Sequence, residues 1–259
     1  MTNSETAAPE APKVATDLEW QDLRSVIAAG WADFRAMPIY GLFFALFYTL
    51  GGIALYFGMV TKGQLIWFIA AAAGFPLLAP FAAIGIYEVS RRREAEEDVS
   101  WRGVLGALRG RGNGQLSAMA VTVLIVFGFW VVLARVIFAI FFAQSGIGQE
   151  TADMLLSTQG IAMLAVGSIV GALIALALFS VTVVSLPMLL DRDVDFVTAM
   201  IASVEVVRRN RTTMMTWAAL IAALLFVSML PVFLGLLIAL PVLGHATWHL
   251  YRRAVPVPG

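Results

Sequence analysis

The chain has 259 residues, of which 60% are hydrophobic and only 13% are charged, and its mean hydropathy is +0.87. Soluble domains carry roughly 25% charged residues, so this composition excludes an ordinary soluble globular domain and indicates an integral membrane protein. The formal net charge of zero gives no sign of a nucleic-acid partner. The absence of cysteine excludes disulfides, thiolate metal sites, iron–sulfur clusters and cysteine nucleophiles.

The two ends of the chain are predicted to be tails. Residues 1–17 are rich in Ala, Glu, Pro and Thr, and they lack the basic region and apolar core of a cleavable signal. We expect them to form a disordered cytoplasmic tail, with insertion driven by the first membrane helix. Residues 254–259 form a second, shorter tail, which leaves residues 18–253 as the membrane domain.

Residues 16–35 predict an amphipathic helix that lies in the headgroup layer. Thr16 and Glu19 have the spacing of a capping box at a helix start. Pro38 ends the helix, because proline disfavours helical backbone at the preceding residue. The apolar positions recur at three and four residues, namely Trp20, Leu23, Ile27, Trp31 and Phe34, while Glu19, Asp22, Arg24, Asp33 and Arg35 fill the other faces.

Six apolar runs follow, each suited to a membrane helix of about twenty residues. The second run carries no charge over residues 63–87 and contains Pro76 and Pro80, so we expect a kinked span. The predicted spans are residues 39–57, 65–87, 116–133, a span within 161–190, 213–230 and 232–251.

Arg135 is the one charge inside the apolar run of residues 116–142. A charge within the membrane suggests a functional role. However, about twenty residues of helix are enough for one crossing, and that length separates Gln115 from Arg135. We favour an Arg135 that reaches the external headgroups while residues 136–142 lie along the interface.

The order of amphipathic helix, membrane helix and membrane helix occurs three times, in units 18–98, 99–192 and 193–253. Residues 80–92 align without gaps with residues 241–253, so that a proline, an aromatic, a polar residue and two arginines coincide. The second and third amphipathic helices are expected to start at Ser100 and at Asp193 or Asp195.

The distribution of basic residues sets the orientation. All of the 17 Lys and Arg residues except Lys62 and Arg135 fall in segments predicted to be cytoplasmic, which places both termini in the cytoplasm of a bacterial inner membrane. Five arginines at the inner ends of spans are candidates for topology determination or for binding anionic lipid. They are Arg91, Arg92, Arg93, Arg252 and Arg253.

His245 and His249 lie four residues apart, and hence on one face of the sixth span. Imidazoles so placed can bind a metal ion or haem iron. Glu88 occupies the position equivalent to His249 in the first unit, so it is a candidate partner of this polar site. The alternative, which we favour, is a structural role at the inner interface, because no third ligand stands in the same run.

Gly167 and Gly171 begin a stripe of small residues on the fourth span, which Ala175 continues. Small residues let membrane helices approach closely. The stripe predicts helix packing within the chain or in a homodimer, and the sequence leaves both open.

Four segments carry a resemblance to a known family. They are GW-x-DFR at residues 30–35, PLLAPFAAIGIYEVSRR at 76–92, SLPMLLDRDVDF at 185–196 and LPVLGHATWHLYRR at 240–253. The chain is similar over residues 18–253 to an uncharacterised bacterial family of multi-pass inner-membrane proteins with a domain of unknown function. The resemblance implies six membrane helices, and it supplies no activity, substrate or catalytic residue.

The sequence therefore predicts an all-α membrane protein with six membrane helices in three hairpins, each hairpin preceded by an amphipathic interfacial helix. No catalytic motif is found, so we expect no enzyme and no cofactor. The leading hypothesis is a non-enzymatic scaffold or accessory protein whose partners are the lipid bilayer and a membrane protein or a second copy of the chain. The alternatives are a small-solute transporter or channel with helix breaks at Pro76, Pro80, Pro187 and Pro241, and a haem- or metal-binding protein centred on His245 and His249.

Overall fold

A computed structural model describes residues 13–60, 62, 65–74, 79–107, 114–142 and 152–256. The secondary structure of these residues consists of α-helices without strands. The helices in chain order are α1 (Trp20–Ala36), α2 (Pro38–Val60), α3 (Leu65–Gly74), α4 (Ala79–Glu94), α5 (Trp101–Ala107), α6 (Gln115–Phe142), α7 (Ala152–Leu156), α8 (Thr158–Thr182), α9 (Ser185–Asp191), α10 (Phe196–Arg209), α11 (Arg211–Met229) and α12 (Leu236–Ala254). Residues 1–12 of the predicted tail, Pro76, Arg109, Arg111 and Glu150 lie outside the described residues.

Four helical stretches of the described chain are long and apolar enough to cross a membrane. They are α2, α6, the stretch from Thr158 to Asp191 that contains α8 and α9, and α11. α3 and α4 fall within the second predicted span, and residues 75–78 between them lie outside the described residues; the sixth span corresponds to α12. α3 and α4 are each shorter than 18 residues, and α12, which has 19 residues, is less apolar than the four stretches, so the prediction of six spans stays a prediction.

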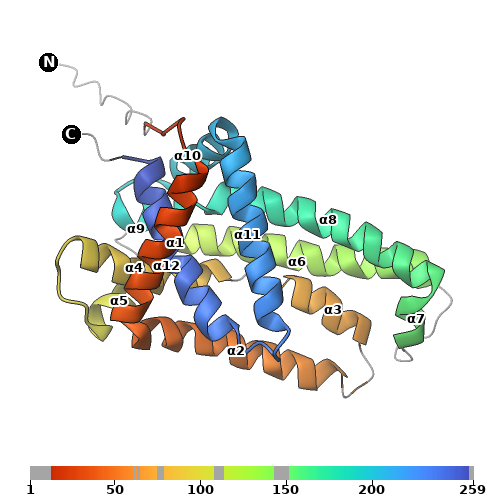
Figure 1. The fold of residues 1–259 in the computed structure, drawn as a ribbon. Coiled ribbons are helices and arrows are strands. Elements are labelled where there is room, and N and C mark those ends of the chain that lie inside the picture. Colours follow the sequence, from red (N-terminus) through yellow and green to blue (C-terminus); the bar gives the residue numbers. More distant parts are fainter. Residues whose placement is uncertain are drawn as a thin grey trace, which may run out of the picture.

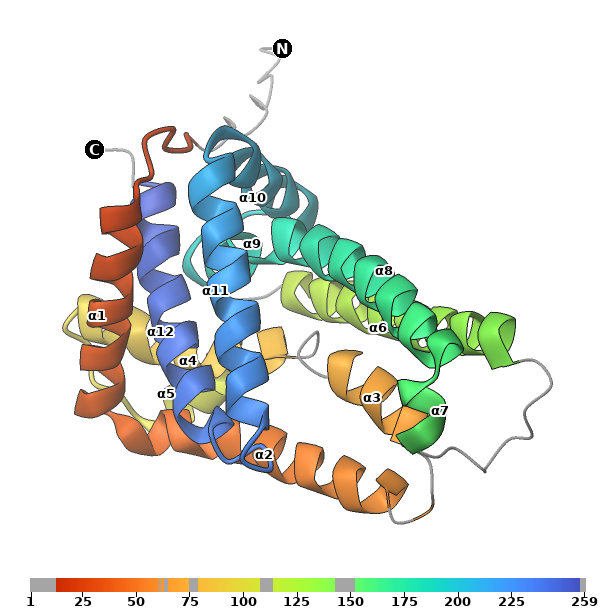
Figure 2. The ribbon, with the colours of Figure 1, turned by 45° about the vertical axis from the view of Figure 1, so that its right-hand side comes forward.

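The helices run in two main directions (Figure 1). α1 and α12 lie side by side and antiparallel, and α4 packs against α12. α6 and α8 form a second antiparallel pair, which together with α2 extends away from α1 and α12 (Figure 2). Residues 80–92 and 241–253, which align in sequence, therefore lie in neighbouring helices.

α12 is the most enclosed of the long helices, although it is less apolar than the four membrane stretches. Its buried side chains continue from Leu236 through Trp248 to Ala254. The apolar helices instead expose large side chains, such as Phe47 on α2, Ile125 on α6 and Phe226 on α11. This inversion is typical of a membrane protein, because exposed apolar groups contact lipid while polar groups turn inward.

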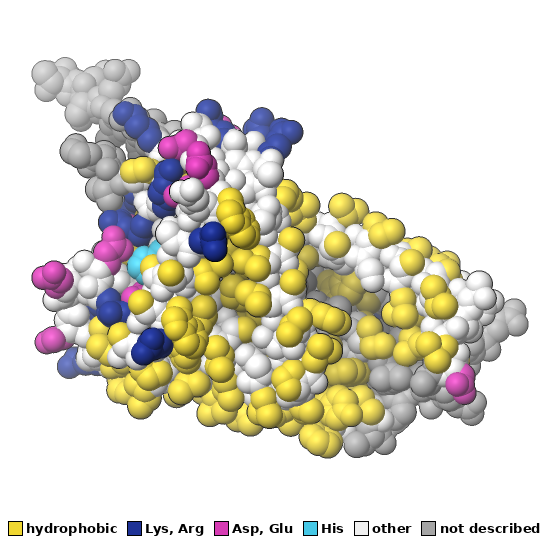
Figure 3. Space-filling view, in the orientation of Figure 1, with side chains coloured by type: hydrophobic (Ala, Val, Ile, Leu, Met, Phe, Trp, Pro, Cys, Tyr) yellow, Lys and Arg dark blue, Asp and Glu magenta, His cyan; other side chains and the backbone are white. Residues whose placement is uncertain are grey.

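Charged side chains gather along one side of the molecule, on the left in Figure 3, from the ends of α10 and α12 down to the loop between α4 and α5. Hydrophobic side chains dominate the face formed by α2, α11 and α8. Charged and apolar side chains are therefore separated between two parts of the molecule.

Local sequence explains where α1 begins and ends. Glu19 is the N-cap, and its side chain and that of Asp22 form a reciprocal capping box. The predicted box of Thr16 and Glu19 was wrong by three residues, because the helix begins at Trp20 rather than at residue 17. Pro38 starts α2, where its missing N–H costs no helical hydrogen bond.

Other local predictions can be compared directly with the helices. Ser100 and Asp195 cap α5 and α10, as predicted: the Gly103 N–H donates to Ser100 Oγ over 3.3 Å and the Thr198 N–H to Asp195 Oδ1 over 2.9 Å. Arg135 is exposed and lies within α6, which continues without a break to Phe142.

Candidate functional site

A close contact between α1 and α12 creates the polar site. A Cβ atom added to Gly30 would lie 2.6 Å from the backbone nitrogen of Ala246 and 2.7 Å from the carbonyl oxygen of Val242. Only a residue without a side chain allows this approach. Three residues later on α1 and three residues later on α12, Asp33 and His249 meet: Asp33 Oδ2 lies 2.9 Å from His249 Nε2.

Asp33 is the centre of a hydrogen-bonded cluster that joins three helices. Ser90 of α4 donates to Asp33 Oδ2 over 2.6 Å, and its Oγ lies 2.7 Å from His245 Nδ1. Arg93 of α4 forms an ion pair with the other carboxylate oxygen. Asp33, Ser90 and His245 are buried, whereas His249 is partly exposed. We call these five residues the Asp33 cluster.

The protonation state of His245 follows from its neighbours. Ser90 has one hydroxyl hydrogen, and the Asp33 carboxylate can only accept hydrogen bonds. The hydroxyl therefore donates to Asp33 and accepts from Nδ1–H of His245, which leaves the lone pair on Nε2. That buried Nε2 atom has no hydrogen-bond partner among the described residues.

Burial by itself raises the pKa of Asp33. Hydrogen bonds from His249 and Ser90, together with the electrostatic attraction of His249, outweigh burial and lower the pKa below its ordinary value of 3.8. Asp33 is therefore an anion at neutral pH, and it compensates the positive charge of Arg93 within the helix contact.

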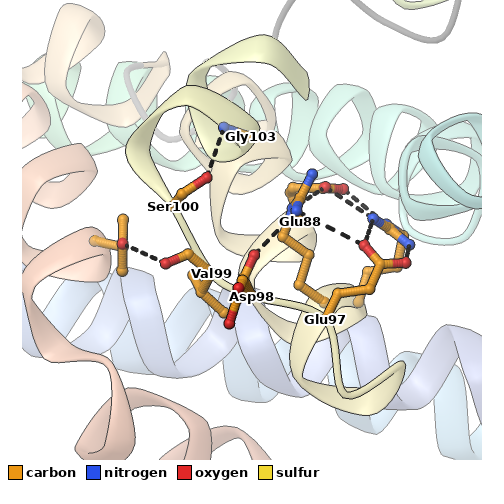
Figure 4. Close-up of polar contacts among 9 residues, drawn as sticks. Glu88, Glu97, Asp98, Val99, Ser100 and Gly103 are labelled. Atoms are coloured by element: carbon orange, nitrogen blue, oxygen red, sulfur yellow. Dashed lines mark hydrogen bonds and ion pairs between the residues drawn. The ribbon is translucent and has the colours of Figure 1, made fainter.

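Glu88 has different partners from those predicted. Its carboxylate binds Arg91 over 2.8 Å and Arg92 over 2.6 Å, and Glu97 turns toward the same two guanidinium groups (Figure 4). Hydrogen bonds from Arg91 to Glu88 and Glu97 raise the pKa of Arg91. The residue that contacts His249 is Asp33, so the expected pairing of Glu88 with the histidines was wrong.

The same arginines hold the loop between α4 and α5. Arg92 donates to the carbonyl oxygen of Asp98 over 3.0 Å, and the Tyr40 hydroxyl of α2 donates to that of Val99, also over 3.0 Å. Figure 4 shows Asp98, Val99 and Ser100 following one another along this loop toward α5. The contacts position α5 beside the first turns of α2.

A second group of contacts joins α12 to α4 and α9. Trp248 and Arg252 both donate to Glu94, over 2.9 and 2.8 Å. Tyr251 donates its hydroxyl to Asp191 over 2.7 Å, and Arg252 lies 3.2 Å from the same carboxylate. Glu94 and Asp191, which end α4 and α9, are thereby tied to the last two turns of α12.

Arg253 extends the contacts to the beginning of the described chain. It binds Asp22 of α1 over 3.0 Å and Asp17 over 3.2 Å. The Ala15 N–H donates to the carbonyl oxygen of Ala254 over 2.8 Å. Residues 13–17, which were assigned to the tail, therefore lie along the end of α12. Each of the five arginines proposed for topology or lipid binding forms an ion pair within the protein, and these are Arg91, Arg92, Arg93, Arg252 and Arg253.

The geometry limits the chemistry of the two histidines. A metal bound by both needs two lone pairs directed at one point, but His249 Nε2 is occupied by Asp33. No group of three or more His, Cys, Asp or Glu side chains in the described parts of the chain is placed to hold a metal ion. Ser90 donates its hydrogen to a carboxylate rather than to an imidazole, which differs from an activated nucleophile.

A second feature is an apolar cavity of about 440 Å³ between α8 and α11. α4, α9 and α12 complete its wall, and Figure 3 shows the surface hollowed between α11 and α8. Small side chains form much of the wall, among them Ala83, Ala172, Ala175, Ala218, Ala219 and Ala222. Two threonines also line it, but Thr182 and Thr247 donate their hydroxyls to carbonyl oxygens of their own helices. The cavity therefore presents a mainly apolar lining, in which the Tyr87 hydroxyl is a further polar group.

The stripe of small residues on α8 is divided between two environments. A Cβ atom on Gly171 would lie 3.0 Å from the Trp130 ring of α6, whereas one on Gly167 would meet nothing within 4 Å. Ala172 and Ala175 face the cavity. Gly171 thus serves the packing of α8 on α6.

The site as a whole lies in a membrane protein. Residues 68–191 match the family model described as Predicted integral membrane protein (DUF2189). The DUF2189 match begins in α3 and ends with α9, so it includes Ser90 and Arg93 but neither Asp33 nor the two histidines. No curated protein and no solved structure matches the chain. The chain is accordingly an integral membrane protein with several apolar helices and a domain of unknown function.

Asp33 and Ser90 were not among the site residues predicted from the sequence. Asp33 was placed on the polar face of an amphipathic helix, although it is 7% exposed. The available signal was its spacing from Gly30. Asp33 follows Gly30 by about one helical turn, so its side chain faces the same neighbouring helix that the glycine allows to pack closely. Ser90, next to three arginines, gave no comparable signal.

Proposed function

We propose that this protein is a non-enzymatic accessory protein of the bacterial inner membrane that holds a membrane lipid between α8 and α11. The observation that carries the proposal is the apolar cavity of about 440 Å³ among the membrane helices. This volume is in the range of pockets that bind small molecules. The ion-paired contacts of α12 with α1, α4 and α9 supply a rigid frame on one side of it.

An acyl chain suits this cavity better than other occupants. An empty space would deprive its lining side chains of van der Waals contacts on one side. Water or a polar solute would find no hydrogen-bond partner in the methyl groups of the alanines and threonines. The apolar lining thus favours lipid over the small-solute transport alternative, and the engagement of His249 with Asp33 speaks against the metal alternative.

Retention of lipid by the purified protein tests the proposal. Ala222 lines the cavity, whereas the adjacent Ala223, which is also exposed, does not. We expect full-length protein in a mild detergent to retain lipid by native mass spectrometry, and Ala222→Phe to retain less because the ring occupies the space. Ala223→Phe is the matched control and retains as much lipid as the wild type. Equal retention by all three proteins would refute the proposal.

The proposed topology has six membrane helices with both termini in the cytoplasm. α2, α6, α8 with α9, and α11 form four spans, and α3 with α4, and α12, form the other two. α5 and α10 lie in the inner headgroup layer, which is supported by their exposed apolar side chains, such as Leu105 at 42% and Ile201 at 65% exposure. α1 runs antiparallel along α12 and therefore stands beside the cytoplasmic half of that span.

Single-cysteine labelling tests this topology without background, because the chain has no cysteine. Lys62→Cys, between α2 and α3, should react with a membrane-impermeant maleimide on intact cells. Arg24→Cys, exposed on α1, should react only after the membrane is permeabilised. The reverse pattern would overturn the orientation, and reaction of both positions on intact cells would overturn the placement of α1.

A further inference from the structure

The cavity wall on α11 continues toward the cytoplasmic end as a single stripe that ends in a cation. Residues of the stripe recur at three and four positions, so they share one face of the helix. In order from the cytoplasmic end they are Arg211, Met215, Ala218, Ala219, Ala222 and Leu225. Arg211 is exposed and stands one turn beyond the first lining residue, Met215.

Neighbouring arginines at this end of the molecule have partners within the protein. Arg208 and Arg209 share Glu205, and Arg192 binds the Tyr251 hydroxyl over 3.0 Å. Arg211 forms no ion pair with any described residue. Its charge is therefore available to an anion at the end of the cavity.

In a bilayer, a protein site that selects between lipids must do so mainly through contacts with the headgroup. Lipid tails outside the protein are as apolar as the cavity, so moving a chain from one to the other gives little hydrophobic free energy. A preference between lipids must then come from the polar end. Arginine binds phosphate through paired, charge-assisted hydrogen bonds.

We propose that the site between α8 and α11 selects an anionic phospholipid, with one acyl chain in the cavity and the phosphate group on Arg211. This assignment rests on the lipid binding proposed above. It differs from the attraction of a basic surface for any anionic membrane, because it depends on one arginine in register with the cavity wall.

Competition between two lipids tests the assignment. Delipidated full-length protein in detergent is titrated with equal amounts of phosphatidylglycerol and phosphatidylcholine of the same chain length, and native mass spectrometry gives the bound ratio. We expect the wild type to prefer phosphatidylglycerol, and Arg211→Gln to lower that preference about fivefold, the effect of one basic residue near a membrane surface. Arg24→Gln is the control, because Arg24 is also exposed but lies on α1.

The outcomes separate the two proposals. Loss of preference in Arg211→Gln alone, with total lipid unchanged, supports the assignment. An equal loss in Arg24→Gln, or no loss in Arg211→Gln, overturns it while leaving lipid binding intact. Unchanged binding of both lipids by Ala222→Phe instead refutes occupancy of the cavity itself.

Discussion

The contact of α1 with α12 and the gap between α8 and α11 show two ways in which helices of one protein meet. In the first, Gly30 allows backbone-to-backbone approach and the Asp33 cluster satisfies nearly every polar atom around it. In the second, alanines face one another across a cavity of about 440 Å³, and α8 and α11 make few contacts. The α1–α12 contact is filled by packed and hydrogen-bonded groups, whereas a cavity remains between α8 and α11.

The difference has a physical origin. In a bilayer, apolar burial does little to hold helices together, so close packing and hydrogen bonds determine which helices stay fixed. α12 has both toward α1 and α4, whereas α8 and α11 have neither toward each other. We therefore expect substitutions at the α1–α12 contact to change stability, and substitutions at the cavity to change what is bound.

The largest effect is expected from Gly30→Leu. The added side chain meets backbone atoms of Ala246 and Val242, which cannot move without separating α1 from α12. We expect a loss of about 4 kcal/mol in the free energy of unfolding, measured by denaturant titration in micelles. Gly58→Leu is the matched control, because a Cβ atom there meets nothing within 4 Å. Replacing an unhindered helical glycine should raise the free energy of unfolding by about 1 kcal/mol. Similar losses in both variants would mean that the close approach does not stabilise the fold.

Composition and periodicity were enough to predict the all-helical chain. An 18-residue apolar stretch in α2, α6, α8 or α11 has few alternatives to a membrane helix, and the caps at Ser100 and Asp195 are local signals. The bounds of α3 and α4 within the second predicted span could not be read from hydropathy. Hydropathy averages over a proline-containing run and does not locate the ends of the helices within it.

The Asp33 cluster could not be assembled in the same way, because its members are separated by most of the sequence. Asp33 and His249 are 216 residues apart. The alignment of residues 80–92 with 241–253 correctly suggested a relation between α4 and α12, but it selected Glu88, which stands beside Arg91 and Arg92. Glu88 forms ion pairs with Arg91 and Arg92, which are its neighbours in sequence. The carboxylate that reaches His249 is that of Asp33, and only the packing of α1 onto α12 brings it there.

A smaller loss is expected when the cluster loses its carboxylate but keeps its shape. Asp33→Asn leaves Arg93 without its ion pair and weakens the hydrogen bond with His249, which predicts a loss of about 2 kcal/mol in the free energy of unfolding at neutral pH. Ser90→Ala removes the donor to Asp33 and leaves the buried Nδ1–H of His245 without its acceptor, and it should cost about 1.5 kcal/mol, less than the loss of the charge. If Ser90→Ala proved the more damaging variant, the carboxylate would not be the centre of the contact.

The pH dependence of the Asp33→Asn effect separates charge from shape. The folded pKa of Asp33 lies below its ordinary value of 3.8, so the stability that its charge contributes is fully present above that value. It is lost as the pH falls through the folded pKa, because the folded protein must then take up the proton that removes the ion pair. The difference in unfolding free energy between wild type and Asp33→Asn should therefore shrink as the pH falls below 3.8 and through the folded pKa. A difference that stayed constant over this interval would show that the contact depends on the size of the Asp33 side chain and not on its charge. The α1–α12 contact would then be held by packing alone, as Gly171 of α8 packs against Trp130 of α6.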